Sequence, residues 1–325
     1  MAKLLEVNHL KKYFRTPAGM LHAVDDVSFT IDEGKTLGVV GESGCGKSTL
    51  GRTVLGLQEA TEGDILFEGR PTKGLPKKEQ KELRRNMQLI FQDPFSSLNP
   101  RYCVSELIAD PLKIYKLCKD KDELQKRVYE LMDTVGLARR LAYSYPHELD
   151  GGRRQRIGIA RALSLDPKFI VCDEPVSALD VSIQAQILNL LQDLQEEKGL
   201  TYIFITHDLS VVKHISDDIL VMYLGVVVEK CPADELFERP LHPYTKGLLS
   251  AIPIPSINVE RHRILLQGEL SSPVEPKPGC RFANRCPHAS DQCRQAQPPL
   301  TEIAPDHFIA CHHAAEIDSL EGART

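Results

Sequence analysis

The sequence predicts an α/β fold with a mainly parallel central sheet. Short apolar segments that are typical of buried strands alternate with longer segments in which apolar residues recur at helical spacing. A glycine-rich loop at residues 41–48 lies between one such strand and a helix. Residues 105–149 are rich in Lys, Glu and Leu, which indicates a helical insert within a strand-rich body.

The N-terminal part of the chain predicts strands. Residues 4–10 alternate loosely between apolar and polar and predict a strand that runs into a loop at residues 11–15. Residues 27–31 alternate in the same way, and Glu33-Gly34 is a turn signal. Residues 36–40 form a short apolar run, as in a strand buried on both faces.

Helices and further strands follow. Residues 47–57 predict a helix that ends near Gly56, and a longer amphipathic helix ends at Lys198-Gly199, where glycine is a favoured cap. Within the insert, apolar residues with a spacing of three and four define one helix face: Leu124, Val128, Leu131, Met132 and Val135. The remaining strands are predicted at residues 169–173, 202–206 and 219–223.

A cluster of prolines after the last helical segment marks a domain boundary. We expect a main body at residues 1–251, with the insert at about 95–155. A proline-rich tether then covers residues 252–279, and a small domain with four cysteines covers residues 280–325.

Composition limits the function classes. The 325 residues carry a formal net charge of −5, whereas a protein that coats nucleic acid needs a basic excess. The longest apolar run, residues 219–228, is far shorter than the ~20 residues of a membrane-spanning helix. The N-terminus lacks the apolar stretch of a secretory signal, so we expect a cytoplasmic chain whose nine cysteines are thiols or metal ligands.

The glycine-rich loop fits the pattern G-x-x-x-x-G-K-[ST] in its required strand–loop–helix context. Its backbone N–H groups can surround phosphates, Lys47 supplies a cation, and the Ser48 hydroxyl can bind Mg²⁺. We therefore predict a nucleoside triphosphate as ligand. The expected binding residues are Gly41, Glu42, Ser43, Gly44, Cys45, Gly46, Lys47, Ser48 and Thr49.

Two carboxylates follow the strand at residues 169–173. Asp173 at the end of that strand can hold Mg²⁺ through water, and Glu174 can orient the water that attacks the γ-phosphate. The alternative is an acidic strand end that faces solvent, which is common but less expected in a chain with a phosphate loop.

Further motifs give the chain a family resemblance. They are Leu89-Ile90-Phe91-Gln92-Asp93-Pro94, Leu149-Asp150-Gly151-Gly152-Arg153, Ser177-Ala178-Leu179-Asp180 and Thr206-His207-Asp208. In this order they look like the Q-loop, signature loop, D-loop and H-loop of the nucleotide-binding subunits of ABC transporters. The resemblance spans residues 4 to about 313 and implies a P-loop ATPase fold with a mainly parallel core sheet, an antiparallel β subdomain and a helical insert.

The resemblance also implies roles for individual residues. Catalysis would fall to Glu174, His207, Lys47 and Gln92, and Mg²⁺ to Ser48, Gln92 and Asp173. The signature loop, Leu149, Asp150, Gly151, Gly152 and Arg153, would complete the ATP site of a second subunit, with Ser177, Ala178, Leu179 and Asp180 as the D-loop beside it. Adenine would stack on Phe14, with Tyr13 as the runner-up.

Three segments narrow the resemblance to ATPases of dipeptide and oligopeptide importers: residues 95–100, 242–253 and 279–287. This implies import of peptides by a peripheral subunit on the cytoplasmic face of the cell membrane. Its partners would be a second ATPase subunit (in a heterodimer or a homodimer), two membrane permeases and, indirectly, an external binding protein, with no nucleic acid. A nickel importer of the same subfamily and a soluble non-transport ABC ATPase are the alternatives, and an exporter is less expected because exporters commonly carry fused membrane helices.

The signature loop departs from its family at two positions. Asp150 stands where the family usually has serine, and Arg153 where it has glutamine. Asp150 either faces the triphosphate of the opposite subunit or turns away to cap the helix that begins at Gly151, since Asp is a favoured N-cap. In the first case this composite site would hydrolyse ATP more slowly.

The tail cysteines are Cys280, Cys286, Cys293 and Cys311. Their spacing lacks the C-x-x-C pairs of zinc sites, and they can simply be buried thiols. However, a tail of this length cannot bury much and generally needs a staple. Some relatives of the subfamily hold a [4Fe–4S] cluster here, so the resemblance favours that cluster over Zn²⁺, with His288, His312 and His313 as alternative ligands.

Overall fold

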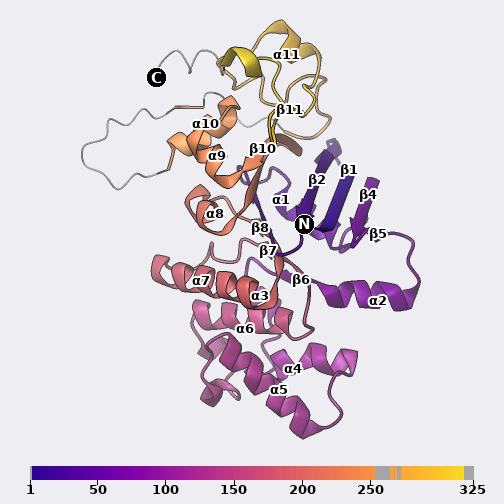
Figure 1. Cartoon of the computed structure of the whole chain (residues 1–325), viewed down its shortest axis with the longest axis vertical. Coiled ribbons are helices and arrows are strands. Elements are labelled where there is room, and N and C mark those ends of the chain that lie inside the picture. The colour runs from indigo at the N-terminus through magenta and orange to yellow at the C-terminus, as the bar shows by residue number, and fades with distance from the viewer. Residues whose placement is uncertain (1, 253–263, 267, 269–271, 318–325) are drawn as a thin grey trace, which may run out of the picture. The chain divides into compact units, whose positions relative to one another are not determined.

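The computed structural model describes residues 2–252, 264–266, 268 and 272–317. The chain forms two compact units, whose elements are labelled in Figure 1. The first is built mainly from Gly74–Ile203, and the second from Lys3–Ile31, Thr36–Lys73 and the chain from Phe204 onward. Much of the predicted tether at residues 252–279 lies outside the described residues, so the domain boundaries stay a prediction.

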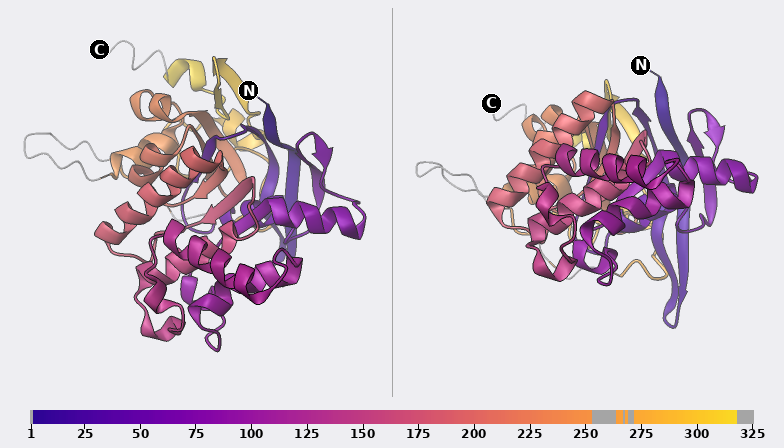
Figure 2. Two further views of the ribbon diagram at one scale, coloured as in Figure 1. Left: turned by 60° about the horizontal axis from the view of Figure 1, so that its bottom comes forward. Right: turned by 90° about the horizontal axis from the view of Figure 1, so that it is seen from below.

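The second unit begins with an antiparallel sheet in the order β2-β1-β4-β5, in which β1 and β2 form a long hairpin (Figure 2). Its strands are β1 (Lys3–Thr16), β2 (Gly19–Asp32), β4 (Glu62–Phe67) and β5 (Arg70–Pro71). The predicted loop at residues 11–15 is wrong, because these residues continue β1. Cross-strand polar pairs hold them there: Lys11 Nζ lies 2.7 Å from Glu62 Oε2, and the Tyr13 N–H donates to Thr61 Oγ1 at 2.9 Å.

A second group of strands in this unit has the order β11-β12-β10-β9-β3. The strands are β3 (Thr36–Val40), β9 (Asp218–Tyr223), β10 (Val226–Pro232), β11 (Thr301–Ala304) and β12 (His307–Ile309). β3 and β9 are parallel, with Gly38 opposite Ile219, whereas the pairs β9–β10, β10–β12 and β11–β12 are antiparallel. The tail strands therefore pair with strands of the body of the unit.

Short helices complete the second unit. They are α1 (Lys47–Val54), α8 (Leu209–Ile215), α9 (Ala233–Glu238), α10 (Pro243–Ser250) and α11 (Asp291–Gln295). α1 ends at Val54, three residues before the predicted Leu57, and the N–H of its C-cap residue Leu55 closes the last turn on Gly51 O. The long apolar run at residues 219–228 is the β9–β10 hairpin.

The first unit combines parallel strands with helices. β6 (Met87–Ile90) and β7 (Phe169–Asp173) are parallel, with Leu89 opposite Val171, and β8 (Thr201–Ile205) neighbours β7. The helices are α2 (Lys77–Asn86), α3 (Pro94–Ser97), α4 (Val104–Tyr115), α5 (Lys121–Thr134), α6 (Gly151–Leu163) and α7 (Val181–Lys198). Single 3-10 turns occur at Arg139–Leu141 and Pro146–Glu148.

The helical insert is held by one apolar cluster. α4, α5 and α6 pack on one another in the lower part of Figure 1. Val128, Met132 and Val135 of the predicted helix face are at most 1% exposed, together with Ile108 of α4 and Ile157 of α6. The insert is therefore a small helical core, as its apolar spacing predicts.

The α/β fold with its parallel strands and separate antiparallel sheet is confirmed. The predicted strands at residues 36–40 and 169–173 coincide with β3 and β7, and α7 ends at Gly199, which has φ of 64°. In the part of the chain that the structure describes, no helix combines the length and apolar character needed to cross a membrane.

Candidate active site

The phosphate loop connects β3 to α1, and its shape needs glycine. Gly41 has φ of 149°, and a Cβ there would lie 2.2 Å from Met222 O. Gly46 has φ of 104°, and its Cβ would lie 2.0 Å from Ala23 O. Because carbonyl oxygens of neighbouring strands occupy both positions, no side chain fits, and the loop backbone packs closely on the sheet.

Lys47 folds back over this loop. Its Nζ donates to Gly41 O at 2.8 Å and to Glu42 O at 3.0 Å, and the residue is 5% exposed. Burial raises the pKa of the neighbouring Cys45 thiol, so Cys45 is a neutral wall of the loop. The first turn of α1 therefore presents backbone N–H groups and one positive charge, which is an anion site.

Tyr13 and Phe14 differ in their contacts. The Tyr13 ring stacks on His22 with centroids 3.9 Å apart, and its hydroxyl donates to Asp25. Phe14 instead lies under Lys12 Nζ, 4.8 Å from the ring centroid. Burial and the hydrogen bond to Asp25 raise the Tyr13 pKa, so this hydroxyl stays a donor.

The first unit brings Gln92 and Glu174 together. They follow β6 and β7, whose parallel pairing places Ile90 opposite Cys172, so both side chains emerge at the same sheet edge. Gln92 Nε2 donates to Glu174 Oε2 at 2.9 Å. Asp173, the last residue of β7, is 1% exposed, and Glu174 has φ of 47°, which is strained for a non-glycine residue.

In the signature loop, Asp150 makes the contacts of a helix cap. Asp150 is the N-cap of α6, and its Oδ1 accepts the Arg153 N–H at 2.8 Å. Arg153 Nε lies 3.4 Å from the other carboxylate oxygen, with both side chains about half exposed (48% and 59%). Asp150 thus caps the helix and pairs with Arg153.

The D-loop packs against the signature loop within the same unit. A Cβ on Gly151 would lie 3.0 Å from Leu179 Cδ2, and one on Gly152 would lie 2.5 Å from Ile183 Cγ2. Asp180 caps α7 by accepting the Ile183 N–H at 3.1 Å. Ser177 and Ala178 are exposed beside these contacts. The two glycines of the signature therefore let the D-loop and the first turn of α7 approach the α6 N-terminus.

His207 belongs to the second unit and follows β8 directly. It is exposed, and Asp208 after it caps α8 by accepting the Ser210 N–H at 2.8 Å. The cap fixes the backbone at this strand end while the imidazole itself faces outward.

The tail cysteines converge without forming a metal site. Cys280, Cys286 and Cys311 have raised pKa values because they are buried and near one another, and Cys280 reaches about 11. The Cys293 pKa is lowered, because hydrogen bonds from Ser290 and His313 outweigh its burial. Among the described residues, no three His, Cys, Asp or Glu side chains lie close enough together to hold a metal ion, so the structure does not support the predicted iron–sulfur cluster.

Several residues that contact the phosphate loop or Tyr13 have no role that the sequence predicts. Asp25, Tyr244 and Arg285 contact Tyr13, the Glu42 N–H and the Glu42 carboxylate, respectively. Their partners are distant in sequence, and the single available signal is a pair of arginines between two cysteines, Arg281 and Arg285.

Comparison with known families gives two matches. Residues 24–177 match the ABC transporter family, and residues 228–293 match the oligopeptide/dipeptide transporter C-terminal region. The second match includes Cys280, Cys286 and Cys293 and ends before Cys311.

Individual relatives agree with these matches. The oligopeptide transport ATP-binding protein OppF of Bacillus subtilis is 58% identical over 85% of this chain and 94% of its own length. OppF of Escherichia coli is 52% identical over 94% of this chain and 92% of its own length. Among solved structures, the ATP-binding cassette MJ0796, a dimer in a post-hydrolysis state bound to ADP and Pi, has a TM-score of 0.65 at 30% identity and covers 71% of this chain and 99% of that one.

Proposed function

The chain belongs to the oligopeptide transport ATP-binding proteins of the ABC transporter family, and from this premise we propose that it powers import of dipeptides and oligopeptides across the cell membrane. It is an ATP-hydrolysing subunit of such a transporter. The observation that carries the proposal is the phosphate loop, in which Lys47 and the first turn of α1 form an anion site.

We assign the roles within this site as follows. The loop from Gly41 to Thr49 receives the phosphates, because its backbone follows a path that glycines at 41 and 46 alone permit. Lys47 neutralises charge on the outer phosphates. When bound, Mg²⁺ would supply charge neutralisation between the phosphates, and the oxygen donors Ser48, Gln92 and Asp173 suit such a hard cation.

Glu174 is the residue that orients the attacking water. Its carboxylate accepts a hydrogen bond from Gln92, which fixes its direction, and a carboxylate is a suitable group to accept a water proton. Gln92 therefore links the water-orienting group to the Q-loop. His207 is proposed to contact the γ-phosphate, and the fixed backbone at Asp208 supports that position.

For adenine, the contacts favour the runner-up. Tyr13 is held by His22 and Asp25, so its ring is already oriented before nucleotide binds, whereas the Phe14 contact is a cation–π pair with Lys12. We therefore propose Tyr13, in place of Phe14, as the stacking aromatic.

Dimerisation would complete each ATP site. Leu149, Asp150, Gly151, Gly152 and Arg153 would face the ATP of a second ATPase subunit, with Ser177 to Asp180 beside it. The exposed D-loop positions Ser177 and Ala178 are compatible with such an interface. Two membrane permeases, an external binding protein that acts through them, and a peripheral place on the cytoplasmic face follow from the proposed transport function.

Metal binding by the tail is a separate proposal. Cys280, Cys286, Cys293 and Cys311 act electrostatically on one another, and a soft metal would relieve that mutual destabilisation of thiolates. The side chains as placed do not form a ligand group. Binding of a [4Fe–4S] cluster or Zn²⁺ would therefore require the four cysteine sulfur atoms to move closer together. Metal analysis of the purified protein decides between the two.

The test of the proposed function is ATP-dependent uptake into proteoliposomes that contain the chain with its membrane subunits. Uptake of a labelled oligopeptide should require ATP and be lost with Lys47→Ala, while an Arg294→Gln variant, changed at an exposed tail position, should transport normally. Uptake of Ni²⁺ without peptide uptake would support the nickel alternative. ATPase activity with neither would point to a non-transport ATPase.

A further inference from the structure

The loop between Cys280 and Cys286 reaches the phosphate loop through Arg285. Its Nη1 lies 2.8 Å from Glu42 Oε2, and its Nη2 lies 3.1 Å from Glu42 Oε1. The Arg285 side chain is 8% exposed and that of Glu42 is 23% exposed. This is a two-pronged, mostly buried ion pair on the second residue of the phosphate loop.

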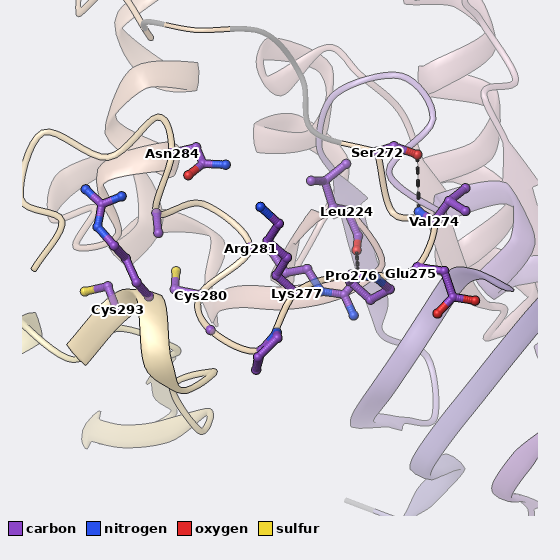
Figure 3. Close-up of a pocket in the computed structure, with 14 residues that line it drawn as sticks. Leu224, Ser272, Val274, Glu275, Pro276, Lys277, Cys280, Arg281, Asn284 and Cys293 are labelled. Carbon is purple, nitrogen blue, oxygen red and sulfur yellow. Dashed lines mark hydrogen bonds between the residues drawn. The ribbon is translucent and has the colours of Figure 1, made fainter. Parts of the chain in front are cut away.

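Arg281 makes a parallel connection on the adenine side. One of its N–H groups donates to Leu224 O at 2.7 Å, as Figure 3 shows, and the other pairs with Asp25. Asp25 also accepts from the Tyr13 hydroxyl and lies 3.0 Å from His22 Nδ1. A single tail arginine therefore neutralises the carboxylate that holds the aromatic pair.

The turn between β9 and β10 joins these two connections. Leu224, which accepts from Arg281, is followed by Gly225, whose N–H donates to Cys45 O at 2.9 Å. The Asp25 N–H donates to Gly225 O at 2.8 Å. The phosphate loop, the turn and the adenine side thus share one hydrogen-bonded network with the tail.

Phe282 packs against two tyrosines next to this network. It is 1% exposed, and its ring packs edge-on against Tyr223 with centroids 5.2 Å apart and beside Tyr244 at 5.5 Å. The Tyr244 oxygen accepts the Glu42 N–H at 2.8 Å. Glu42 is therefore held at its backbone by Tyr244 and at its carboxylate by Arg285, and both supports depend on the tail loop.

We propose that the loop between Cys280 and Cys286 is a positioning element of the nucleotide site, in which Arg285 sets the phosphate loop and Arg281 sets Tyr13. The physical reason is preorganisation: a loop already held in its binding geometry loses less freedom when ATP binds. The inference rests on ATP binding by this phosphate loop, as proposed above, and adds the tail loop to the parts of the chain that shape the site.

Loss of Arg285 leaves a carboxylate unpaired on the loop that receives a triphosphate. Arg285→Gln should therefore weaken ATP binding about tenfold, the scale of one charged hydrogen-bonded pair. At saturating ATP the turnover number should stay within about twofold, because the reacting groups are elsewhere. Adding Glu42→Gln removes the unpaired charge and should restore part of the affinity.

The experiment is equilibrium binding of a fluorescent ATP analogue to the purified full chain, followed by KM and kcat in the assembled transporter. The variants are Arg285→Gln, Arg285→Lys, Arg281→Gln and Arg285→Gln with Glu42→Gln. Arg294→Gln is the matched control, because it removes an exposed arginine from the same tail. Thermal melting of each variant identifies any that fail to fold.

The proposal is supported if Arg285→Gln binds ATP more weakly but keeps its kcat. It also requires that Arg285→Lys and the double change restore part of the affinity and that the Arg294→Gln control behaves like the parent. Parental affinity in Arg285→Gln and Arg281→Gln overturns it, as does a double change that is as weak as the single one. If Arg285→Gln fails to fold, parental affinity and KM in the folded Arg285→Lys and Arg281→Gln variants overturn it as well. Absence of ATP binding by the parent chain itself would instead refute the proposed function.

Discussion

Replacement of Asp150 by Ser together with Arg153→Gln tests whether the unusual signature loop slows ATP hydrolysis. In the structure the Asp150 carboxylate caps α6 through the Arg153 N–H at 2.8 Å and pairs with the Arg153 side chain at 3.4 Å. Ser is also a good cap, so the change should cost only a few tenths of a kcal/mol in stability. The lost ion pair is half exposed and contributes at most about 1 kcal/mol.

The expected gain in rate is correspondingly small. One like-charge pair at about 4 Å costs on the order of 1 kcal/mol in water and roughly 4 kcal/mol at an effective dielectric of 20. Because Asp150 is 59% exposed and paired with a cation, the water value is the upper limit here. Removal of the carboxylate should therefore speed the partner's site by at most about fivefold.

The assay is the ATPase rate of heterodimers in which this chain's own site is silenced by Lys47→Ala. All turnover then comes from the site that the signature loop of this chain completes. Asp120→Ser is the control, because Asp120 caps α5 in the same way, by accepting the Glu123 N–H at 2.8 Å, outside the signature. An unchanged or slower rate in the double variant would show that the Asp150–Arg153 pair is no brake.

Three further outcomes are expected. Glu174→Gln keeps an oxygen for the Gln92 hydrogen bond, so ATP affinity should stay the same while turnover at this chain's own site falls about 100-fold or more; equal ATPase rates with the partner subunit present would refute the assignment. Burial lowers the His242 pKa to about 4, below its unfolded value near 6.5. The stability that neutral His242 contributes is therefore present above pH 6.5 and is lost as the pH falls toward 4. Urea titrations should show about 2 kcal/mol less stability at pH 5 than at pH 7 from this residue, and His242→Asn should remove that part of the loss. Anaerobically purified protein should contain about four iron atoms per chain if the tail thiolates hold a cubane cluster, and stoichiometric zinc without iron would exclude it.

Local pattern was sufficient wherever the determining interactions are local. The apolar runs that became β3 and β7 are fully buried strands, and no competing helical spacing exists at residues 36–40 or 169–173. The cap at Asp150 follows from its own chain neighbour, Arg153, three residues away. Such features depend on a few consecutive residues, so the sequence alone predicts the two strands and offers the cap as one of two alternatives.

Pairing between distant segments is where prediction failed. Residues 11–15 carry charges that favour a loop, but Glu62 and Thr61 on the neighbouring strand supply partners for them. The contacts of Tyr13 are equally hidden, because nothing near it in sequence indicates that Asp25 and His22 hold its ring. Both cases concern contacts whose partners are separated by at least nine residues.

Residues of the tail that belong to no nucleotide-binding motif also contact the residues around this site. Its cysteines are visible in the sequence, whereas Arg281 and Arg285 acquire meaning only through Asp25 and Glu42, which are more than 240 residues away. Burying an arginine without a partner costs free energy. The side chains of Arg281 and Arg285 are each 8% exposed, and each is paired with a carboxylate near the proposed nucleotide site. The two ion pairs therefore stabilise both segments: the phosphate loop helps to fold the tail, and the tail helps to hold the phosphate loop. A change at the cysteines that displaces this loop should accordingly appear first as altered nucleotide affinity, before any change in the chemistry at Glu174.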